Sequence, residues 1–247
     1  MKIVGIIPAR FGSTRFPGKP LADIFGLPMI LRVVEQAEKA KTLSAVVVAT
    51  DDERIANVVR AAGKNVVMTS SHHPSGTDRC LEALNVWGKD ADAIINIQGD
   101  EPYIKPEQID QLAGLISRAE SDIATLCVQI EDPSWLSDPN KVKLVADELG
   151  NAMYFSRQAI PFVKDLPMDQ WLNTHPFYKH LGIYAYKSAI LEKICGMPMS
   201  SMEKAESLEQ LRWLQNGLRI KVGITHWETP AIDTQADLDK LLKSGLA

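Results

Sequence analysis

A cationic loop near the N-terminus holds the first residues whose types and spacing could do chemistry. The stretch PARFGSTRFPGKP, residues 8–20, carries Arg10, Arg15 and Lys19, and no Asp or Glu occurs before Asp23. It follows the short apolar run KIVGII, which predicts a buried strand. Backbone N–H groups and cationic side chains converge on anions in such loops, so the pattern indicates a phosphate-binding site.

The spacing of this loop excludes two common nucleotide-binding motifs. A Walker loop requires G-x-x-x-x-G-K-[ST], but here five residues separate Gly12 from Gly18, and Lys19 precedes Pro20 rather than a hydroxyl residue. The G-x-G-x-x-G pattern of a dinucleotide-binding loop does not follow the first strand either. We therefore expect neither a P-loop NTPase nor an NAD-dependent enzyme.

The composition of the 247 residues is that of an ordinary globular protein, with 45% hydrophobic and 23% charged residues and a net charge of −4. This charge argues against general nucleic-acid binding. The apolar runs are too short to span a bilayer, and the N-terminus lacks the layout of a signal peptide. Cys80, Cys127 and Cys195 form no C-x-x-C motif and are expected to be buried thiols in a reducing compartment. We expect a cytoplasmic protein.

Strand-like and helix-like segments alternate through the first half of the chain. Hydrophobic patterns predict strands at 44–50, 65–70 and 91–98 and helices at 28–41, 51–63 and 106–120, with Asp78 capping a further helix that starts at Arg79. This order predicts an α/β fold with a mainly parallel sheet and helices on both faces.

The second half is less regular. Strands are expected at 123–130, 141–147, 152–157, 180–186 and 219–225, and helices at 201–217, capped by Ser201, and at 234–245, where Thr234 and Asp237 form a capping pair. Residues 158–177 are expected to form an ordered segment that runs over the surface. Because no linker separates the halves, we expect one domain over 1–247 with an embellished C-terminal half.

Polar residues in and around these segments are candidates for a site. Asp100 stands just beyond the strand at 91–98, where α/β sheets place ligands, although a turn residue would also fit. Arg157 offers a bidentate partner for a carboxylate at a strand end. On the helix at 201–217, Glu206, Glu209, Gln210 and Trp213 form a stripe that suits hydroxyl recognition or a plain solvent-exposed face. His72 and His73 have the wrong spacing for a metal site and are interpreted as loop polar residues.

Seven motifs, in order from residue 3 to about 240, resemble one family. They are PAR-x-x-S-T-R-x-P-G-K-P-L, SGTDR (75–79), NIQGDEP (96–102), YFSR (154–157), YKHLGIYAY (178–186), ESLEQLRWL (206–214) and IDT (232–234). Together they are similar to the CMP-Kdo synthetase, or 3-deoxy-manno-octulosonate cytidylyltransferase, family. The main departure is HWETPAIDT (226–234), where relatives often have a glycine before Asp-Thr.

The resemblance implies a nucleotide-diphospho-sugar-transferase-like, Rossmann-like fold, with nucleotide binding in about 1–130 and sugar binding and dimerisation in about 131–247. It implies that CTP and Kdo react to give CMP-Kdo and pyrophosphate for lipopolysaccharide biosynthesis, in a Mg²⁺-dependent homodimer. The charge, the short apolar runs and the cysteines predict separately a cytoplasmic protein that binds no nucleic acid and does not insert into a membrane.

The resemblance also carries roles onto matching residues. It makes Arg10, Lys19 and Asp100 catalytic and assigns Asp100 and Asp233 to the metal. The residues assigned to nucleotide binding are Pro8, Ala9, Arg10, Ser13, Arg15, Lys19, Ser75, Gly76 and Arg79. The small-residue loop that contains Ser75 and Gly76 would let backbone groups contact the edge of a cytosine ring. Sugar binding falls to Gln98, Arg157, His180, Tyr184, Glu209 and Gln210, of which His180 and Tyr184 share one face of a strand.

Three rival functions remain open at this level. The acceptor could be another acidic sugar, such as 8-amino-Kdo or a sialic acid. A nucleotidyltransferase for neutral sugar phosphates is disfavoured, because it would not need Arg157 with His180. A non-catalytic nucleotide-sensing module on the same fold is expected to have lost Lys19, Asp100 or Asp233, and all three are present.

Overall fold

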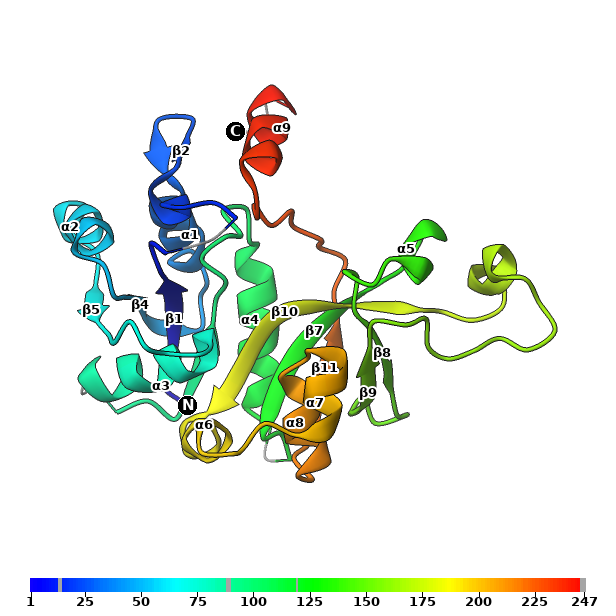
Figure 1. Cartoon of the computed structure of the whole chain (residues 1–247). Coiled ribbons are helices and arrows are strands. Elements are labelled where there is room, and N and C mark those ends of the chain that lie inside the picture. The colour runs from blue at the N-terminus through cyan, green and yellow to red at the C-terminus, as the bar shows by residue number, and fades with distance from the viewer. Residues whose placement is uncertain (13–14, 88–89, 119, 245–247) are drawn as a thin grey trace. The chain divides into compact units, whose positions relative to one another are not determined.

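The computed structural model describes residues 1–12, 15–87, 90–118 and 120–244, and Figure 1 shows its helices and strands. The chain forms two compact units. The first unit comprises Met1–Ala113 and the segment from Thr229 onward, and the second comprises Gly114–Glu228. The C-terminal segment therefore belongs to the same unit as the N-terminal cationic loop.

The first unit is built on a parallel sheet. Its strands lie in the order β6 (Ala93–Asn96), β1 (Ile3–Ala9), β4 (Leu43–Thr50) and β5 (Val66–Met68). Because each neighbouring pair is parallel, the carboxyl ends of these strands meet at one edge, where α/β sheets place their ligands. The predicted α/β class with a mainly parallel sheet is confirmed.

Helices cover both faces of this sheet. The chain passes from β1 through α1 (Met29–Ala37) to β4 and through α2 (Glu53–Ala61) to β5, then returns through α3 (Gly76–Trp87) to β6. Right-handed crossovers put α1 and α2 on one face, and the reversal of direction puts α3 on the other. The next helix, α4 (Pro106–Ile116), contains the boundary between the two units.

The start of α3 differs from the expectation that Asp78 caps a helix beginning after it. The helix begins at Gly76, and the Ser75 hydroxyl accepts a hydrogen bond from the Asp78 N–H at 3.2 Å and donates one to Asp78 Oδ2 at 2.6 Å. Ser75 therefore supplies the capping oxygen and Asp78 lies inside the first turn, because Ser is as good a cap as Asp and precedes it here.

The C-terminal helix α9 (Gln235–Ser244) is held by apolar packing within the first unit. Leu238 and Leu241 form a buried cluster with Ile232, with Ile24 of the short hairpin β2 (Asp23–Ile24) and β3 (Leu27–Pro28), and with Met29. The predicted capping pair is confirmed, since the Thr234 hydroxyl and Asp237 Oδ2 lie 2.8 Å apart. This cluster anchors the segment that carries Asp233.

The second unit has a mixed sheet. Strand β10 (Tyr178–Lys187) is antiparallel to β7 (Ile123–Gln129) and β8 (Lys143–Ala146), β8 is antiparallel to β9 (Ala152–Ser156), and β11 (Ile220–Ile224) is parallel to β7. The five predicted strands are confirmed, with ends that differ by a few residues. The unit also contains α5 (Ser134–Ser137) and α6 (Ser188–Cys195).

The prediction of a single helix over residues 201–217 is wrong. The structure has α7 (Ser201–Glu206) and α8 (Gln210–Gln215), separated at Ser207, whose φ of 52° is left-handed and ends a helix. Ser200, rather than Ser201, caps α7 in a capping box with Glu203. The predicted stripe of Glu206, Glu209, Gln210 and Trp213 therefore does not lie along one helix.

Residues 158–177 form an ordered segment of the second unit, as expected. A short 3₁₀ helix, η2 (Met168–Asn173), carries Trp171, whose ring stacks on Phe177 with centroids 5.8 Å apart. Trp171 is buried with Ile130 and Leu136, and its indole N–H donates to the Leu166 carbonyl at 2.9 Å. In Figure 1 this yellow-green segment extends away from β8 and β9.

The cysteines only partly match their expected burial. Cys80 and Cys127 are buried, whereas Cys195 is partly exposed. Burial raises the pKa of the Cys127 thiol to about 12, which keeps it protonated and unreactive.

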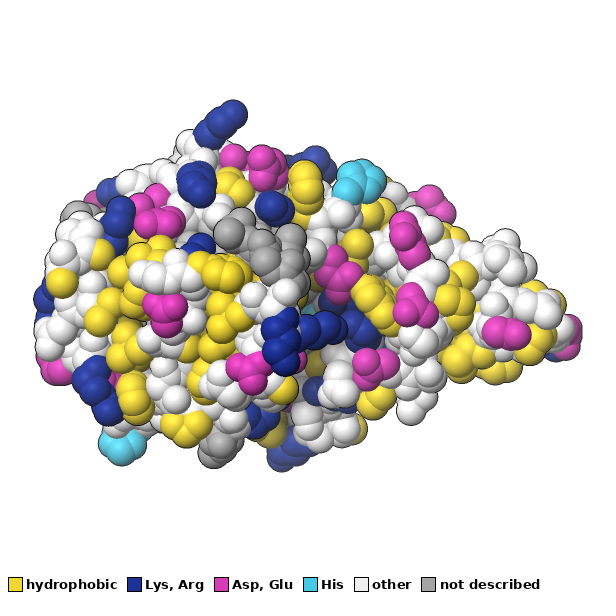
Figure 2. Space-filling view, turned by 90° about the horizontal axis from the view of Figure 1, so that it is seen from above, with side chains coloured by type: hydrophobic (Ala, Val, Ile, Leu, Met, Phe, Trp, Pro, Cys, Tyr) yellow, Lys and Arg dark blue, Asp and Glu magenta, His cyan; other side chains and the backbone are white. Residues whose placement is uncertain are grey.

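Side chains of both signs are interspersed over the face drawn in Figure 2. Among the described residues, no helix combines the length and apolar character needed to cross a membrane.

Candidate functional site

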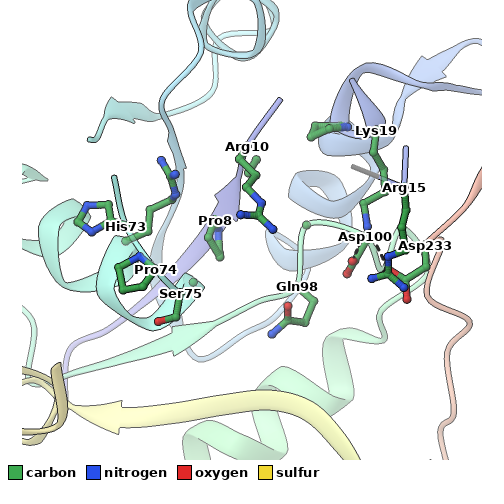
Figure 3. A pocket seen from close by; sticks show the side chains of 15 residues that line it. Pro8, Arg10, Arg15, Lys19, His73, Pro74, Ser75, Gln98, Asp100 and Asp233 are labelled. Atoms are coloured by element: carbon green, nitrogen blue, oxygen red, sulfur yellow. Dashed lines mark hydrogen bonds and ion pairs between the residues drawn. The ribbon is translucent and has the colours of Figure 1, made fainter. Parts of the chain in front are cut away.

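A pocket opens in the first unit at the carboxyl edge of its parallel sheet (Figure 3). Three segments supply most of the wall: the loop after β1, the start of α3 and the loop after β6. The lining residues are Pro8, Ala9, Arg10, Arg15, Lys19, Pro20, His73, Pro74, Ser75, Gly76, Arg79, Gln98, Gly99, Asp100 and Asp233. Every candidate residue of the first unit lies in this pocket except Ser13, which lies outside the described residues.

The cationic loop after β1 is shaped by two close backbone approaches. Gly18 has a φ of 71°, and its N–H donates to the Phe11 carbonyl at 3.0 Å, which closes the loop. Lys19 then begins a short 3₁₀ helix, η1 (Lys19–Leu21). At Gly99 a Cβ atom would stand 2.8 Å from the Pro8 carbonyl oxygen, so only glycine lets the loops after β1 and β6 come this close.

Three ion pairs join the acids and cations at one end of the pocket. Lys19 Nζ lies 2.7 Å from Asp100 Oδ2 and 3.4 Å from Asp233 Oδ1, and Arg15 lies 3.2 Å from the same Asp233 oxygen. The Lys19 side chain is 15% exposed, and those of Asp100 and Asp233 are 26% and 44% exposed. Figure 3 shows these four side chains together, away from Ser75 and His73 at the other end.

The backbone explains why Asp100 and Asp233 meet. The Ile232 N–H donates to the Asp100 carbonyl at 2.9 Å, and the Thr229 hydroxyl donates to the Glu101 carboxylate at 3.0 Å. The Asp233 N–H itself donates to Asp237 Oδ2 at 3.1 Å. These bonds fix the C-terminal segment against the loop after β6, so the two carboxylates face each other across Lys19.

The opposite end of the pocket is formed by the start of α3. Gly76 packs on Pro8, since a Cβ there would lie 3.5 Å from the proline ring. Backbone groups at the start of α3 therefore stand close to the end of β1. A flat ring could lie against this surface with backbone donors and acceptors at its edge.

Arg79 lines the pocket, but its guanidinium already has protein partners. The side chain is 5% exposed and donates to the Thr69 hydroxyl at 2.6 Å and to Asp51 Oδ2 at 3.3 Å. These contacts tie α3 to the ends of β4 and β5. A contact of Arg79 with a nucleotide stays a prediction.

Sequence reasoning missed four lining residues: Pro20, His73, Pro74 and Gly99. His73 contacts the Glu82 carboxylate of α3, whose other hydrogen bond comes from the Ser70 N–H at 2.8 Å. Burial tends to raise the pKa of Glu82, but these hydrogen bonds outweigh it and hold the pKa below its usual value. The position of His73 directly before Pro74-Ser75-Gly76 was the signal that could have placed it in the wall.

In the second unit, Arg157 makes a set of contacts that the sequence did not indicate. Its guanidinium donates to the carbonyls of Glu206 at 2.7 Å, Pro139 at 2.9 Å and Ser207 at 3.3 Å. The Glu206 carboxylate in turn accepts from the Arg157 N–H at 2.9 Å and from the Ser156 hydroxyl at 2.7 Å. Arg157 therefore stabilises the segment between α7 and α8. A contact of Arg157 with a sugar carboxylate stays a prediction.

His180 and Tyr184 lie side by side in an aromatic cluster of the second unit. Their ring centroids are 5.2 Å apart, although four residues of a regular strand would separate them by about 13 Å. The register of β10 against β7 shifts between Leu181 and Tyr184, and this irregularity brings the rings together. Trp213 meets the Tyr184 ring edge-on at 5.2 Å.

Two polar atoms of this cluster, the Tyr184 hydroxyl oxygen and the Trp213 indole nitrogen, are fully buried. Burial lowers the pKa of His180 to about 3, so its imidazole is neutral, and Thr125 Oγ1 lies 3.0 Å from Nε2. Burial, with the nearby Glu209 charge, raises the pKa of Tyr184 well above its usual value. Within the described part of the chain, the Tyr184 hydroxyl and the Trp213 indole N–H have no hydrogen-bond partner. Such groups are few in native proteins.

The remaining candidates do not form the stripe that the sequence predicts. Gln210 is buried, and Glu209 lies 3.2 Å from the Arg212 guanidinium. Gln98 lies in the first unit, in the pocket wall next to Gly99 and Asp100.

The site suits a hard divalent cation bound together with phosphates. Among the described residues, no group of three or more His, Cys, Asp or Glu side chains could hold a metal alone. Mg²⁺, however, is commonly bound by one or two carboxylates with the other ligands from phosphate and water. Asp100 and Asp233 already converge on one cation, the ammonium group of Lys19, and so fit this donor set.

Comparisons with known proteins identify the family of this chain. The family model described as Cytidylyltransferase matches residues 4–220. A 3-deoxy-manno-octulosonate cytidylyltransferase from Parabacteroides distasonis is 53% identical over 98% of this chain and 97% of its own length. An 8-amino-3,8-dideoxy-manno-octulosonate cytidylyltransferase from Shewanella pealeana is 48% identical over 96% of each chain.

A solved structure of a CMP:2-keto-3-deoxy-manno-octonic acid synthetase complexed with CTP superposes with a TM-score of 0.91. It is 40% identical, over 99% of this chain and 98% of that one. The family match over most of the chain and the identity over its full length leave one conclusion, which the order of the motifs also indicated. The chain belongs to the cytidylyltransferase family, in the branch that contains the 3-deoxy-manno-octulosonate cytidylyltransferases.

Proposed function

We propose that this protein transfers CMP from CTP to the anomeric hydroxyl of Kdo, giving CMP-Kdo and pyrophosphate. One observation carries the proposal: the family's cationic loop and its two acids converge on a single pocket at the carboxyl edge of a parallel sheet. The relatives named as Kdo cytidylyltransferases, which match along the whole chain, support the choice of substrates.

In this proposal the cationic end of the pocket binds the triphosphate. Arg10, Arg15 and Lys19, with Ser13 from outside the described residues, offset the charge that builds on the pyrophosphate as it leaves. Phosphoryl-type transfer asks a protein mainly for positioning and charge stabilisation rather than covalent chemistry. The anomeric hydroxyl of the sugar releases its proton as its oxygen attacks the α-phosphorus. The bond from that phosphorus to the pyrophosphate oxygen breaks, and pyrophosphate leaves with the electron pair.

Asp100 and Asp233 would hold Mg²⁺ against the phosphates. Bound there, the metal would supply positive charge that draws the phosphate oxygens together and stabilises the transition state. The two aspartates would position it, and the hydrogen bond between the Ile232 N–H and the Asp100 carbonyl maintains their spacing.

The other end of the pocket would hold the cytosine ring. Pro8 and Ala9 give it a surface, and backbone groups around Ser75 and Gly76 read its edge, where the N4 amino group distinguishes cytosine from uracil. Arg79 would act at this end mainly by holding α3 in place through Asp51 and Thr69.

Within the second unit, the proposed sugar contacts are Arg157, His180, Tyr184, Glu209 and Gln210. Gln98, in the pocket wall of the first unit, is proposed separately as a sugar contact. The adjacency of His180 and Tyr184, whose ring centroids are 5.2 Å apart, is consistent with two contacts to one ligand. Arg157 would have to exchange a backbone carbonyl for the sugar carboxylate.

The direct test is pyrophosphate release with each of the four nucleoside triphosphates, with and without Kdo. We expect release only with CTP and Kdo together. Release with a neutral sugar phosphate, or none with any acidic sugar, would contradict the proposal.

One observation favours a second candidate for the sugar that accepts CMP, the 8-amino derivative of Kdo. Relatives from two Shewanella species that are 48% identical are named 8-amino-3,8-dideoxy-manno-octulosonate cytidylyltransferases. Kdo and its 8-amino derivative should therefore be compared in the same assay, and the higher kcat/KM identifies the substrate. We further propose that the enzyme works as a cytoplasmic homodimer in lipopolysaccharide biosynthesis.

A further inference from the structure

Lys19 stands between the two carboxylates that the proposed function assigns to the metal. We propose that its ammonium group competes with the metal for Asp100 and Asp233 until a bound triphosphate draws it away. The inference rests on the proposed function and concerns the regulation of that same site: metal binding becomes conditional on the nucleotide.

The geometry makes the competition direct. Lys19 Nζ contacts an oxygen of each aspartate, at 2.7 Å and 3.4 Å, and with a 15% exposed side chain it is the most buried member of the cluster. A Mg²⁺ ion shared by the same carboxylates would lie about 2.1 Å from their oxygens. The ion and the ammonium group would then stand within a few ångströms of each other, where two cations repel strongly.

The Lys19 backbone is anchored, so that only its side chain has to move. The Lys19 N–H donates to the Phe16 carbonyl at 3.2 Å, and the Lys19 carbonyl accepts from the Ala22 N–H at 3.0 Å. The flexible four-carbon stem can therefore swing within the pocket while η1 stays in place. Arg15 is a weaker competitor, because it touches only Asp233 and is 67% exposed.

A triphosphate in this pocket would be a better partner for the ammonium group than the aspartates are. It carries several negative charges and meets Arg10 and Arg15 as well as Lys19 along the same wall. Once the ammonium group contacts phosphate, both carboxylates become available to the metal. Nucleotide and metal should therefore bind with positive coupling, each strengthening the other.

The test measures metal and nucleotide binding separately in the full-length protein. Mn²⁺ serves as the probe, and the EPR signal of free Mn²⁺ reports its binding without nucleotide. Lys19→Met keeps the stem and removes the charge. We expect it to bind Mn²⁺ about tenfold more tightly than the wild type, the lower end of the effect of one charge on a neighbouring carboxylate, while its affinity for CTP without metal falls.

These opposite signs separate the proposal from simpler roles. A lysine that served only the phosphates would lower CTP affinity on substitution and leave Mn²⁺ binding unchanged, and this result would overturn the competition. Substitution of a merely structural lysine would lower both affinities, and that result would overturn it as well. Asp100→Asn in the Lys19→Met background should abolish the gain, and a gain that persists would show that Mn²⁺ binds elsewhere.

A matched control uses the same substitution in a similar ion pair. Lys64 lies 2.6 Å from Glu38 in the first unit, outside the pocket, so Lys64→Met should change neither affinity. Lys19→Gln serves as a second variant if Lys19→Met does not fold. The proposed function is tested independently by wild-type Mn²⁺ binding with CTP present. If that binding is lost in Asp100→Asn and Asp233→Asn, the metal site stands even where the competition fails.

Discussion

The Asp100 carbonyl accepts a hydrogen bond from the Ile232 N–H at 2.9 Å, which joins the loop after β6 to the C-terminal segment. Asp233 follows Ile232 directly. This single backbone contact therefore brings the carboxylates of Asp100 and Asp233, which are far apart in the sequence, to one end of the pocket. This contact is stabilised by an apolar cluster in which Ile232 packs with Leu238, Leu241, Ile24 and Met29. The proposed metal site thus depends on how α9 packs as well as on the parallel sheet.

Asp100→Asn and Asp233→Asn should each raise the Mg²⁺ concentration needed for half-maximal rate and lower turnover, because a neutral amide replaces an anionic ligand. The double variant should lose less than the sum of the single losses, since both residues act through one ion. We expect Asp100 to matter more, as its side chain is less exposed than that of Asp233. Titration of the rate with Mg²⁺ measures this. Full activity of Asp233→Asn at limiting Mg²⁺ would remove Asp233 from the site.

Lys19→Ala should lower kcat by about 100- to 1,000-fold, the loss expected for one donor that stabilises transition-state charge. The competition inferred for Lys19 does not weaken this expectation, because its ammonium group acts on the phosphates once CTP is bound. Steady-state pyrophosphate release measures the effect, with Lys64→Ala as the control. Turnover like that of the wild type in a folded variant would refute the role.

Arg157→Ala should lower the free energy of unfolding by about 1–3 kcal/mol, because three backbone carbonyls lose a charged donor. Urea denaturation measures this loss. If Arg157 also binds the sugar carboxylate, KM for the sugar should rise while CTP binding changes little. Unchanged stability together with impaired use of both substrates would contradict both roles.

The half-buried His180 should make the protein less stable in mild acid. Its pKa is lowered from 6.5 to about 3 in the folded state, so the unfolded chain binds a proton that the native protein does not. The contribution of His180 to the free energy of unfolding is therefore fully present above pH 6.5. It decreases as the pH falls toward 3, by up to about 1.4 kcal/mol per pH unit.

His180→Phe should remove that contribution, because phenylalanine keeps the aromatic packing against Phe155 and Tyr184 and does not titrate. Urea midpoints of both proteins at pH 7, 6 and 5 measure the difference between wild type and variant, in which the other titrating groups cancel. Parallel pH curves would show that His180 is accessible to protons in the folded state.

The sequence by itself determined most of the elements and most of the residues that line the pocket. Hydrophobic periodicity is local, so the buried runs that became β1, β4 and β6 could be identified without a structure. Since parallel strands present their carboxyl ends at one edge, the residues after them, Arg10 and Asp100 among these, could be assigned to one site. The order of the motifs indicated the family, which the comparisons confirm.

Only the tertiary structure decided the partners of individual side chains. The left-handed Ser207 divides an apparently continuous helix, and a shift in the register of β10 brings His180 next to Tyr184. Arg157 contacts carbonyls that lie far from it in the sequence. Lys19 rests between Asp100 and Asp233 because the C-terminal segment packs back onto the first unit. Such contacts arise from long-range packing, and a local pattern of residue types carries no information about them.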